Sequence, residues 1–162
     1  MARNFDDIDV GEVDEFGAYE VTVDEIVSFA QQYDPQSMHT DPEAAAEGPF
    51  GGLIASGWHT AAITMRLMVE HLFSEMGNAV GKGIDELRWR EPVRPGDVLS
   101  VRTTVVAKEL DERGRGSVRT RVETRRADGT VVQSMYSNAV YPEAGPAAAT
   151  GRSDDGTRND VA

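Results

Sequence analysis

The stretch that decides the fold is Ser56–Met76, which reads S-G-W-H-T-A-A-I-T-M-R-L-M-V-E-H-L-F-S-E-M. Apolar side chains recur in it at steps of three and four residues, the period of a helix with a broad apolar face. They are Trp58, Ala61, Ala62, Met65, Met68, Val69, Leu72 and Met76. This is the longest predicted helix and the only one apolar enough to form a central core element. Charged residues within it argue against a membrane span.

After this helix the period changes to two, which is typical of strands. Leu87 and Trp89 alternate with arginines, and similar runs cover residues 99–105, 118–124 and 130–140. Turn signals such as Pro95-Gly96-Asp97 and Asp128-Gly129 separate the runs. The sequence therefore predicts an antiparallel meander. With a short strand near residues 18–21, it forms a curved sheet around one long helix, an α+β fold.

Upstream of the central helix, Thr22 and Glu25 have the form of a capping box and predict a helix that begins at Val23. Pro35 disfavours helical backbone at the residue before it, so this helix is expected to break at Asp34. Asp41-Pro42 signals a second, short helix through Ala46. A glycine-rich turn, Gly48, Gly51 and Gly52, then leads to the central helix.

Asp34 and His39 lie five residues apart in a segment that we expect to be an irregular loop. An acid and an imidazole that project from one loop suit proton transfer near neutral pH. Two plainer interpretations stay open: Asp34 could simply mark a helix end, and His39 could be a solvated loop residue. A metal site formed with Asp41 is not expected, because the chain has three histidines and no cysteine.

Composition narrows the class of protein. The 162 residues fit one domain, predicted at 1–144, with a disordered acidic tail at 145–162. A net charge of -12 argues against nucleic acid and anionic membranes as partners. Only Lys82 and Lys108 are lysine. This acidic, arginine-rich balance is typical of halophilic proteins, although an ordinary acidic protein is the alternative. No signal peptide is evident, so we expect a cytoplasmic location.

Four features together carry a family resemblance. They are the segment Asp34-Pro35-Gln36-Ser37-Met38-His39, Ala45 six residues beyond the histidine, Ser56-Gly57 at the start of the central helix, and Pro92-Val93-Arg94-Pro95-Gly96-Asp97. Over about residues 5–142 the chain resembles the MaoC-like hydratases of the hotdog fold, which include (R)-specific enoyl-CoA hydratases. It departs from their usual pattern at Gln36-Ser37, where Asn-Pro is common, and at Ser56, where His is common.

The resemblance implies a lyase that reversibly hydrates a trans-2-enoyl thioester, expected to be of CoA, to a (3R)-hydroxyacyl thioester. Asp34 and His39 would be catalytic, with His39 as the base toward water and Asp34 as its acid partner. The amide of Gly57, beside Ser56, would bind the thioester oxygen, and glycine would let the substrate approach closely. No cofactor and no metal are implied. The candidate cations that would bind the CoA phosphates are Lys82, Arg88, Arg90 and Arg94.

Two other functions stay open. One is a hotdog acyl-CoA thioesterase, and the other is a non-catalytic acyl-thioester binding subunit, for which the altered Gln36-Ser37 leaves room. His59 could touch substrate or pack against helix neighbours such as Ile63. In each case we expect a homodimer or a higher homo-oligomer, because one sheet around one helix leaves an edge strand uncovered.

Overall fold

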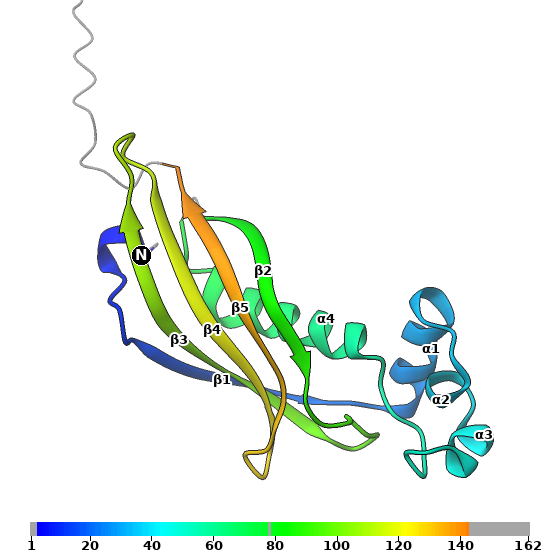
Figure 1. The fold of residues 1–162 in the computed structure, drawn as a ribbon. Coiled ribbons are helices and arrows are strands. Elements are labelled where there is room, and N and C mark those ends of the chain that lie inside the picture. Colours follow the sequence, from blue (N-terminus) through cyan, green and yellow to red (C-terminus); the bar gives the residue numbers. More distant parts are fainter. Residues whose placement is uncertain (1–2, 78, 143–162) are drawn as a thin grey trace, which may run out of the picture.

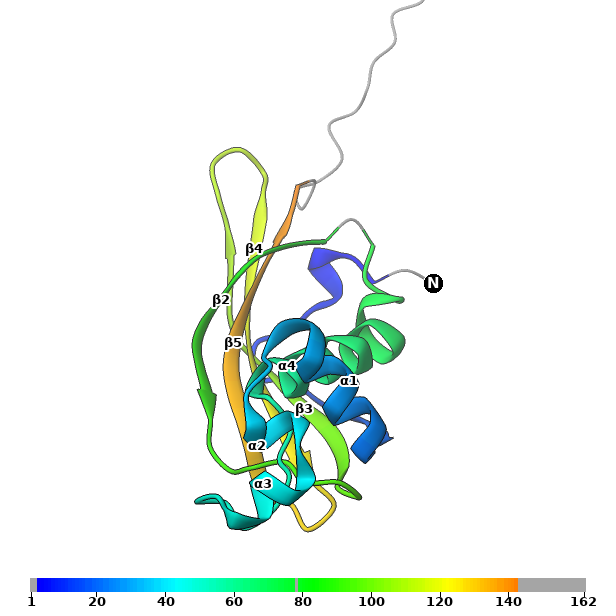
Figure 2. The ribbon, with the colours of Figure 1, turned by 90° about the vertical axis from the view of Figure 1, so that its right-hand side faces the viewer.

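A curved antiparallel sheet wraps around one helix, α4 (Gly57–Met68), in the computed structural model, which describes residues 3–77 and 79–142 (Figures 1 and 2). The predicted tail at 145–162 lies outside the described residues. The strands are β1 (Val13–Glu20), β2 (Val80–Trp89), β3 (Val98–Leu110), β4 (Gly116–Arg126) and β5 (Val131–Tyr141). The predicted meander around a central helix is confirmed, although the first strand is longer and starts earlier than expected.

The five strands lie in the order β1-β3-β4-β5-β2, and every neighbouring pair is antiparallel. The strand that directly follows the helix therefore crosses to the far edge of the sheet. Strand β2 is almost entirely exposed along its length. Its outer edge carries unpaired backbone groups, which are a template for a further strand.

The face of α4 that packs on the sheet differs from the predicted apolar face. Ile63, Leu67 and Met68 are buried, whereas Trp58 is 56% exposed and Met65 is 42% exposed. The buried side also carries polar residues, among them His59, Thr60 and Thr64. The prediction was wrong here because buried threonines can satisfy their hydroxyl groups locally. The Thr64 hydroxyl donates to the Thr60 carbonyl at 2.8 Å.

Continuing from α4, a π-helical turn η2 (Val69–Phe73) ends the helical segment. The main core joins this segment to the inner face of the sheet and to the first helix. Its buried members include Val21, Ile26, Ile63, Leu67, Met68, Leu99, Val101, Val122, Val132 and Met135. A smaller cluster around Phe5, Ile8, Val118 and Tyr141 packs a short 3₁₀ helix, η1 (Phe5–Asp7), at the other end of the sheet.

Three short helices lie at the N-terminal end of α4 (Figure 1). Helix α1 (Val23–Tyr33) is capped by Thr22 as predicted, and helix α3 (Pro42–Glu47) is capped by Asp41. Between them, the expected loop forms a single helical turn, α2 (Ser37–Thr40), that carries His39. The loop prediction was therefore wrong after Gln36. Within the described ranges, no helix is long and apolar enough to cross a membrane.

Candidate active site

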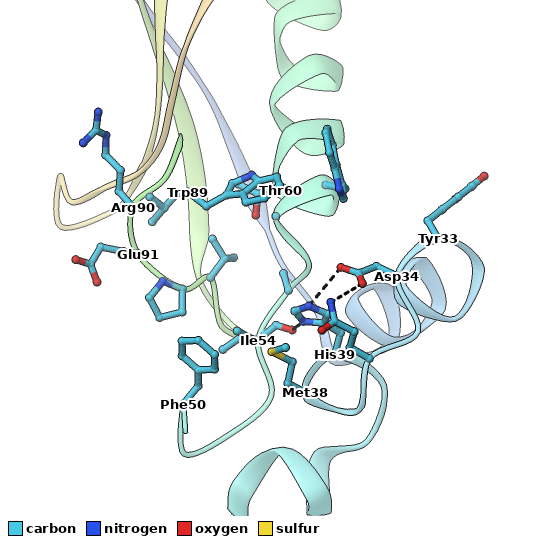
Figure 3. Close-up of a pocket in the computed structure, with 17 residues that line it drawn as sticks. Tyr33, Asp34, Met38, His39, Phe50, Ile54, Thr60, Trp89, Arg90 and Glu91 are labelled. Atoms are coloured by element: carbon cyan, nitrogen blue, oxygen red, sulfur yellow. Dashed lines mark hydrogen bonds and ion pairs between the residues drawn. The ribbon is translucent and has the colours of Figure 1, made fainter. Parts of the chain in front are cut away.

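Asp34 and His39 face each other at the mouth of a cavity (Figure 3). Asp34 is the C-cap of α1, and His39 lies on the following turn, so the helix break at Pro35 turns both side chains to the same side. His39 Nε2 lies 3.4 Å from Asp34 Oδ2. The imidazole is buried, whereas the carboxylate keeps about a fifth of its side chain exposed.

The other ring nitrogen of His39 is held by backbone. His39 Nδ1 lies 2.8 Å from the carbonyl oxygen of Ile54. A carbonyl oxygen only accepts hydrogen bonds, so Nδ1 carries the proton and donates it. In the neutral form of the ring, Nε2 then carries the lone pair, and it faces Asp34 and the cavity. A water molecule in the cavity beside this pair can donate one proton to each of the two atoms.

The carboxylate of Asp34 is held in its ionised form. Gln36 Nε2 donates to Oδ1 at 2.7 Å, and the Ser56 hydroxyl donates to Oδ2 at 2.7 Å. These two hydrogen bonds, with a smaller contribution from His39, lower the pKa of Asp34 below its ordinary value against the opposing effect of burial. Gln36 and Ser56, the two departures from the usual family pattern that reach the site, thus both support the acid.

Ser56 also connects the acid to the helix. It is fully buried and is the N-cap of α4, where its side-chain oxygen accepts a hydrogen bond from the amide of Trp58 at 3.2 Å. The next residue, Gly57, is the first residue of the helix, where amide groups have no intrahelical acceptor and the helix dipole favours negative charge. One serine therefore both caps α4 and fixes the Asp34 carboxylate beside the N-terminus of this helix.

Packing in the protein itself, and not only the approach of a substrate, requires a residue without a side chain at position 57. A Cβ atom at this position would lie 2.2 Å from Cε2 and 2.3 Å from Cδ2 of Trp89. The indole ring thus lies directly against the Cα of Gly57. Sequence reasoning had explained this glycine by the substrate alone. The nearby tryptophan is a second physical cause that the chain order does not reveal.

The cavity between these groups has a volume of about 530 Å³. Its walls are mostly apolar, with Asp34, His39 and the first turn of α4 on one side; the other lining residues include Met38, Phe50, Ile54, Trp58, Trp89, Pro92, Val93 and Val132. Among the four predicted phosphate-binding cations, Arg90 lines this cavity, and Arg94 binds the backbone carbonyl of Phe50 at its rim. Lys82 lines a separate hollow on the sheet.

The remaining sequence candidates have structural roles. The ring of His59 stacks on Phe29, with centroids 4.8 Å apart, and burial lowers its pKa. It does not line the cavity, so the packing alternative holds, with Phe29 rather than Ile63 as the stacking partner. The Asp41 carboxylate accepts the amides of Glu43 and Ala44 as a helix cap. Sequence reasoning missed Trp89, which lines the cavity, and Gln133, which accepts a hydrogen bond from the Trp89 indole, because only the strand register brings them to α4.

An acid and an imidazole beside the N-terminus of a helix that is wrapped by one antiparallel sheet define a hotdog-fold protein with a site suited to proton transfer. A family comparison gives the particular group: the model described as MaoC-like domain matches residues 9–128. The chain therefore belongs to the MaoC-like dehydratase family, as its resemblance predicted.

Individual relatives agree with this assignment. The chain is 36% identical over 107 residues to 3-hydroxyacyl-thioester dehydratase Z of Mycobacterium tuberculosis, covering 64% of this chain and 69% of that protein. The crystal structure of a MaoC-like dehydratase from Rhodospirillum rubrum matches with a TM-score of 0.78 and 40% identity, over 86% of this chain and 96% of that one. The R-hydratase PhaJ1 of Pseudomonas aeruginosa, at 24% identity and a TM-score of 0.70, shares the fold, over 86% of each chain.

Proposed function

We propose that this protein catalyses the reversible hydration of a trans-2-enoyl thioester of CoA to a (3R)-3-hydroxyacyl thioester. The observation that carries the proposal is the pair of facing acceptors, Asp34 Oδ2 and His39 Nε2, 3.4 Å apart beside the N-terminus of α4. This pair can hold one water by both of its protons. The dehydratase names of two relatives, a 3-hydroxyacyl-thioester dehydratase and a 3-hydroxybutyryl-CoA dehydratase, support both the reaction class and a thioester substrate.

The chemistry divides among three groups. In the hydration direction His39 Nε2 takes a proton from the held water, and the hydroxyl oxygen bonds to C3 of the enoyl group. The electron pair of the double bond moves toward the thioester oxygen, which accepts a hydrogen bond from the amide of Gly57. His39 then returns the proton to C2. Water has been added across the double bond, and the residues are restored.

In this scheme Asp34 stays ionised. Its lowered pKa suits a carboxylate that orients the water and stabilises the imidazolium that forms 3.4 Å away. This division departs from the sequence expectation that Asp34 supplies the proton. Because the water is held on one face of the substrate, its hydroxyl group and its proton are both added to that face. The addition is therefore syn, in keeping with a (3R) product.

Activity of two variants tests the proposal. Purified protein is expected to remove the enoyl absorbance of crotonyl-CoA, and Asp34→Asn and His39→Ala are each expected to lower kcat by about a hundredfold or more. Free thiol is assayed in the same samples. Thiol release without hydration would support the thioesterase alternative. Tight binding without turnover, unchanged in both variants, would support the binding subunit; either result contradicts the hydratase.

We propose a homodimer as the working assembly. Strand β2 offers an open edge, and the neighbouring side of the helical segment exposes Trp58, Met65 and Val69. A second copy that pairs along β2 would cover both features. The predicted halophilic character and cytoplasmic location stay predictions.

A further inference from the structure

His59 joins two helices of the site without lining its cavity. It is the third residue of α4, two positions after Gly57, and it packs against α1, the helix that ends at Asp34. The imidazole lies nearly parallel to the ring of Phe29, with ring centroids 4.8 Å apart and an angle of 11° between the planes. Phe29 in turn contacts Tyr33, the last residue of α1, at a centroid distance of 5.0 Å. A row of three rings therefore connects the start of α4 to the residue before Asp34.

The imidazole of His59 is buried with one of its nitrogens unpaired. The residue is 6% exposed, and its Nδ1 atom has no hydrogen-bond partner among the described residues. Most buried polar groups in proteins are paired, so an unpaired one is unusual. A phenylalanine would fill the same space and stack on Phe29 without leaving a polar atom unpaired. Packing alone therefore does not account for a histidine at this position.

The surroundings of His59 oppose a positive charge on its ring. Protonation gives both ring nitrogens an N–H group, so the buried Nδ1 then needs an acceptor that the described residues do not supply. The residue also lies in the first turn of α4, where the helix dipole disfavours a cation. Burial lowers the pKa of His59 below its ordinary value, which keeps the imidazole neutral at pH 7.

The charged and titratable groups near the ring offset this cost only in part. On α1, Glu25 favours the imidazolium, and its carboxylate accepts a hydrogen bond from the Tyr19 phenol of β1. Asp24 and Tyr33, also of α1, line the same shallow hollow as the ring. On α4, the guanidinium of Arg66 lies over the ring of Tyr19, 5.5 Å from its centroid. The effect of Glu25 is smaller than that of burial, so the neutral form is favoured.

Resting on the proposed function, we propose that His59 is a positioning residue that makes the hydration site sensitive to acid. The neutral imidazole holds α1 against the first turn of α4, and so fixes Asp34 relative to Gly57. When the ring takes up a proton, this contact weakens, and the carboxylate is no longer held in place beside the helix N-terminus. Activity is therefore expected to be lost, reversibly, as the pH falls below the ordinary histidine pKa of about 6.5.

Acid also protonates His39, so the test compares variants of His59 with wild type across a range of pH. His59→Phe keeps the stack on Phe29, and its kcat for crotonyl-CoA at about pH 7.5 is expected to lie within about twofold of wild type. His59→Ala removes the ring and is expected to lower kcat about tenfold with a smaller change in KM, because a displaced catalytic group slows the chemical step. Between about pH 7.5 and about pH 5.5, kcat of wild type is expected to fall at least about threefold more than that of His59→Phe.

Two further measurements do not depend on turnover. The unfolded chain binds a proton at this histidine below about pH 6.5, whereas the folded protein resists it, so acid lowers the stability of wild type. The fall in Tm between about pH 7.5 and about pH 5.5 is therefore expected to be smaller in His59→Phe. By NMR, the carboxyl signal of Asp34 is expected to change as the His59 ring titrates, and this step is expected to be absent in His59→Phe.

His71→Phe is the matched control, because His71 also stacks on a phenylalanine, Phe16, with centroids 5.5 Å apart, but is exposed. Its response to acid is expected to equal that of wild type. A His59→Phe protein whose kcat and Tm respond to acid as wild type does, or a folded His59→Ala protein with wild-type kcat, overturns the inference. If no protein turns over crotonyl-CoA, the proposed function fails by itself. The Tm and NMR measurements then decide whether His59 couples acid to the position of Asp34.

Discussion

At the scale of single residues, the site depends on which atoms carry protons. The carbonyl of Ile54 fixes the Nδ1 proton of His39, and Gln36 and Ser56 keep the Asp34 carboxylate charged. None of these three residues is a proton-transfer group. Together they place a proton on Nδ1 of His39 and favour the ionised form of Asp34, so that Nε2 is the ring atom that faces the carboxylate.

Ser56→Ala tests this arrangement. The substitution removes one of the two side-chain donors to Asp34, so the pKa of this carboxyl is expected to rise toward its ordinary value. We expect kcat at neutral pH to fall about tenfold, the cost of one hydrogen bond to a charged group. The acid limb of the pH–rate profile moves to higher pH. Carboxyl NMR of Asp34 measures the shift directly, and an unchanged titration would contradict the assignment.

The same pKa has a consequence for stability. Because the Asp34 carboxyl has a lower pKa in the folded protein than in the unfolded chain, its ionised form favours folding at pH values above the unfolded pKa of about 3.9. That contribution is lost as the pH falls through the folded value. In Ser56→Ala this acid-sensitive part of the stability is expected to shrink.

At the scale of elements, the contact between α4 and β2 joins the site to the sheet. Gly57 has no side chain where Trp89 lies, and a β-bulge between Asp85 and Arg88 of β2 turns Trp89 toward the helix. The helix start and the strand end are therefore matched to each other. A substitution in either element at this contact is therefore expected to alter the packing of the other.

A double-mutant cycle measures this match. Gly57→Ala is expected to lower the free energy of unfolding by about 1–3 kcal/mol, because the new methyl group clashes with the indole. In a Trp89→Ala background the same substitution is expected to cost much less, since the space is then open. Urea denaturation of the four proteins gives the coupling. Additive effects would show that substrate approach alone explains the glycine.

At the scale of the whole molecule, the open edge of β2 predicts dimerisation. Light scattering is expected to give twice the chain mass of 17.6 kDa. Ile84→Asp and Val69→Asp place charge on the proposed interface and are expected to yield monomers. Leu110→Asp, at an exposed apolar position at the end of β3, is the control and should remain dimeric. A monomeric wild type would contradict the assembly.

The net charge of -12 predicts stabilisation by salt. Between about 0.1 M and about 1 M KCl the Debye length falls from about 10 Å to about 3 Å, so repulsion among exposed carboxylates weakens and Tm is expected to rise. Reversing four exposed acids to lysine would change the charge from -12 to -4 and should remove most of this gain. The four are Glu43, Glu47, Glu109 and Glu112. An equal salt response in both proteins would exclude charge repulsion as its cause.

The sequence by itself determined the elements and the acid–imidazole pair of the candidate site. Caps, prolines and the two hydrophobic periods act over a few residues, so the helix from Val23, the break at Asp34, the central helix and the meander were all predictable. Asp34 and His39 come together for the same reason, since only one turn separates them. The fold class then followed from the order of these elements.

Only the tertiary structure decided how the site is completed. Three hydrogen bonds of the site join residues that are far apart in the sequence. Ser56 and Asp34 are separated by 22 positions, Ile54 and His39 by 15, and Gln133 and Trp89 by 44. The side of α4 that is buried and the direction of Trp89 depend on strand register and on one extra residue in β2. The physical reason is that side-chain direction in a paired strand follows from its alignment with distant strands, and local sequence patterns do not contain that alignment.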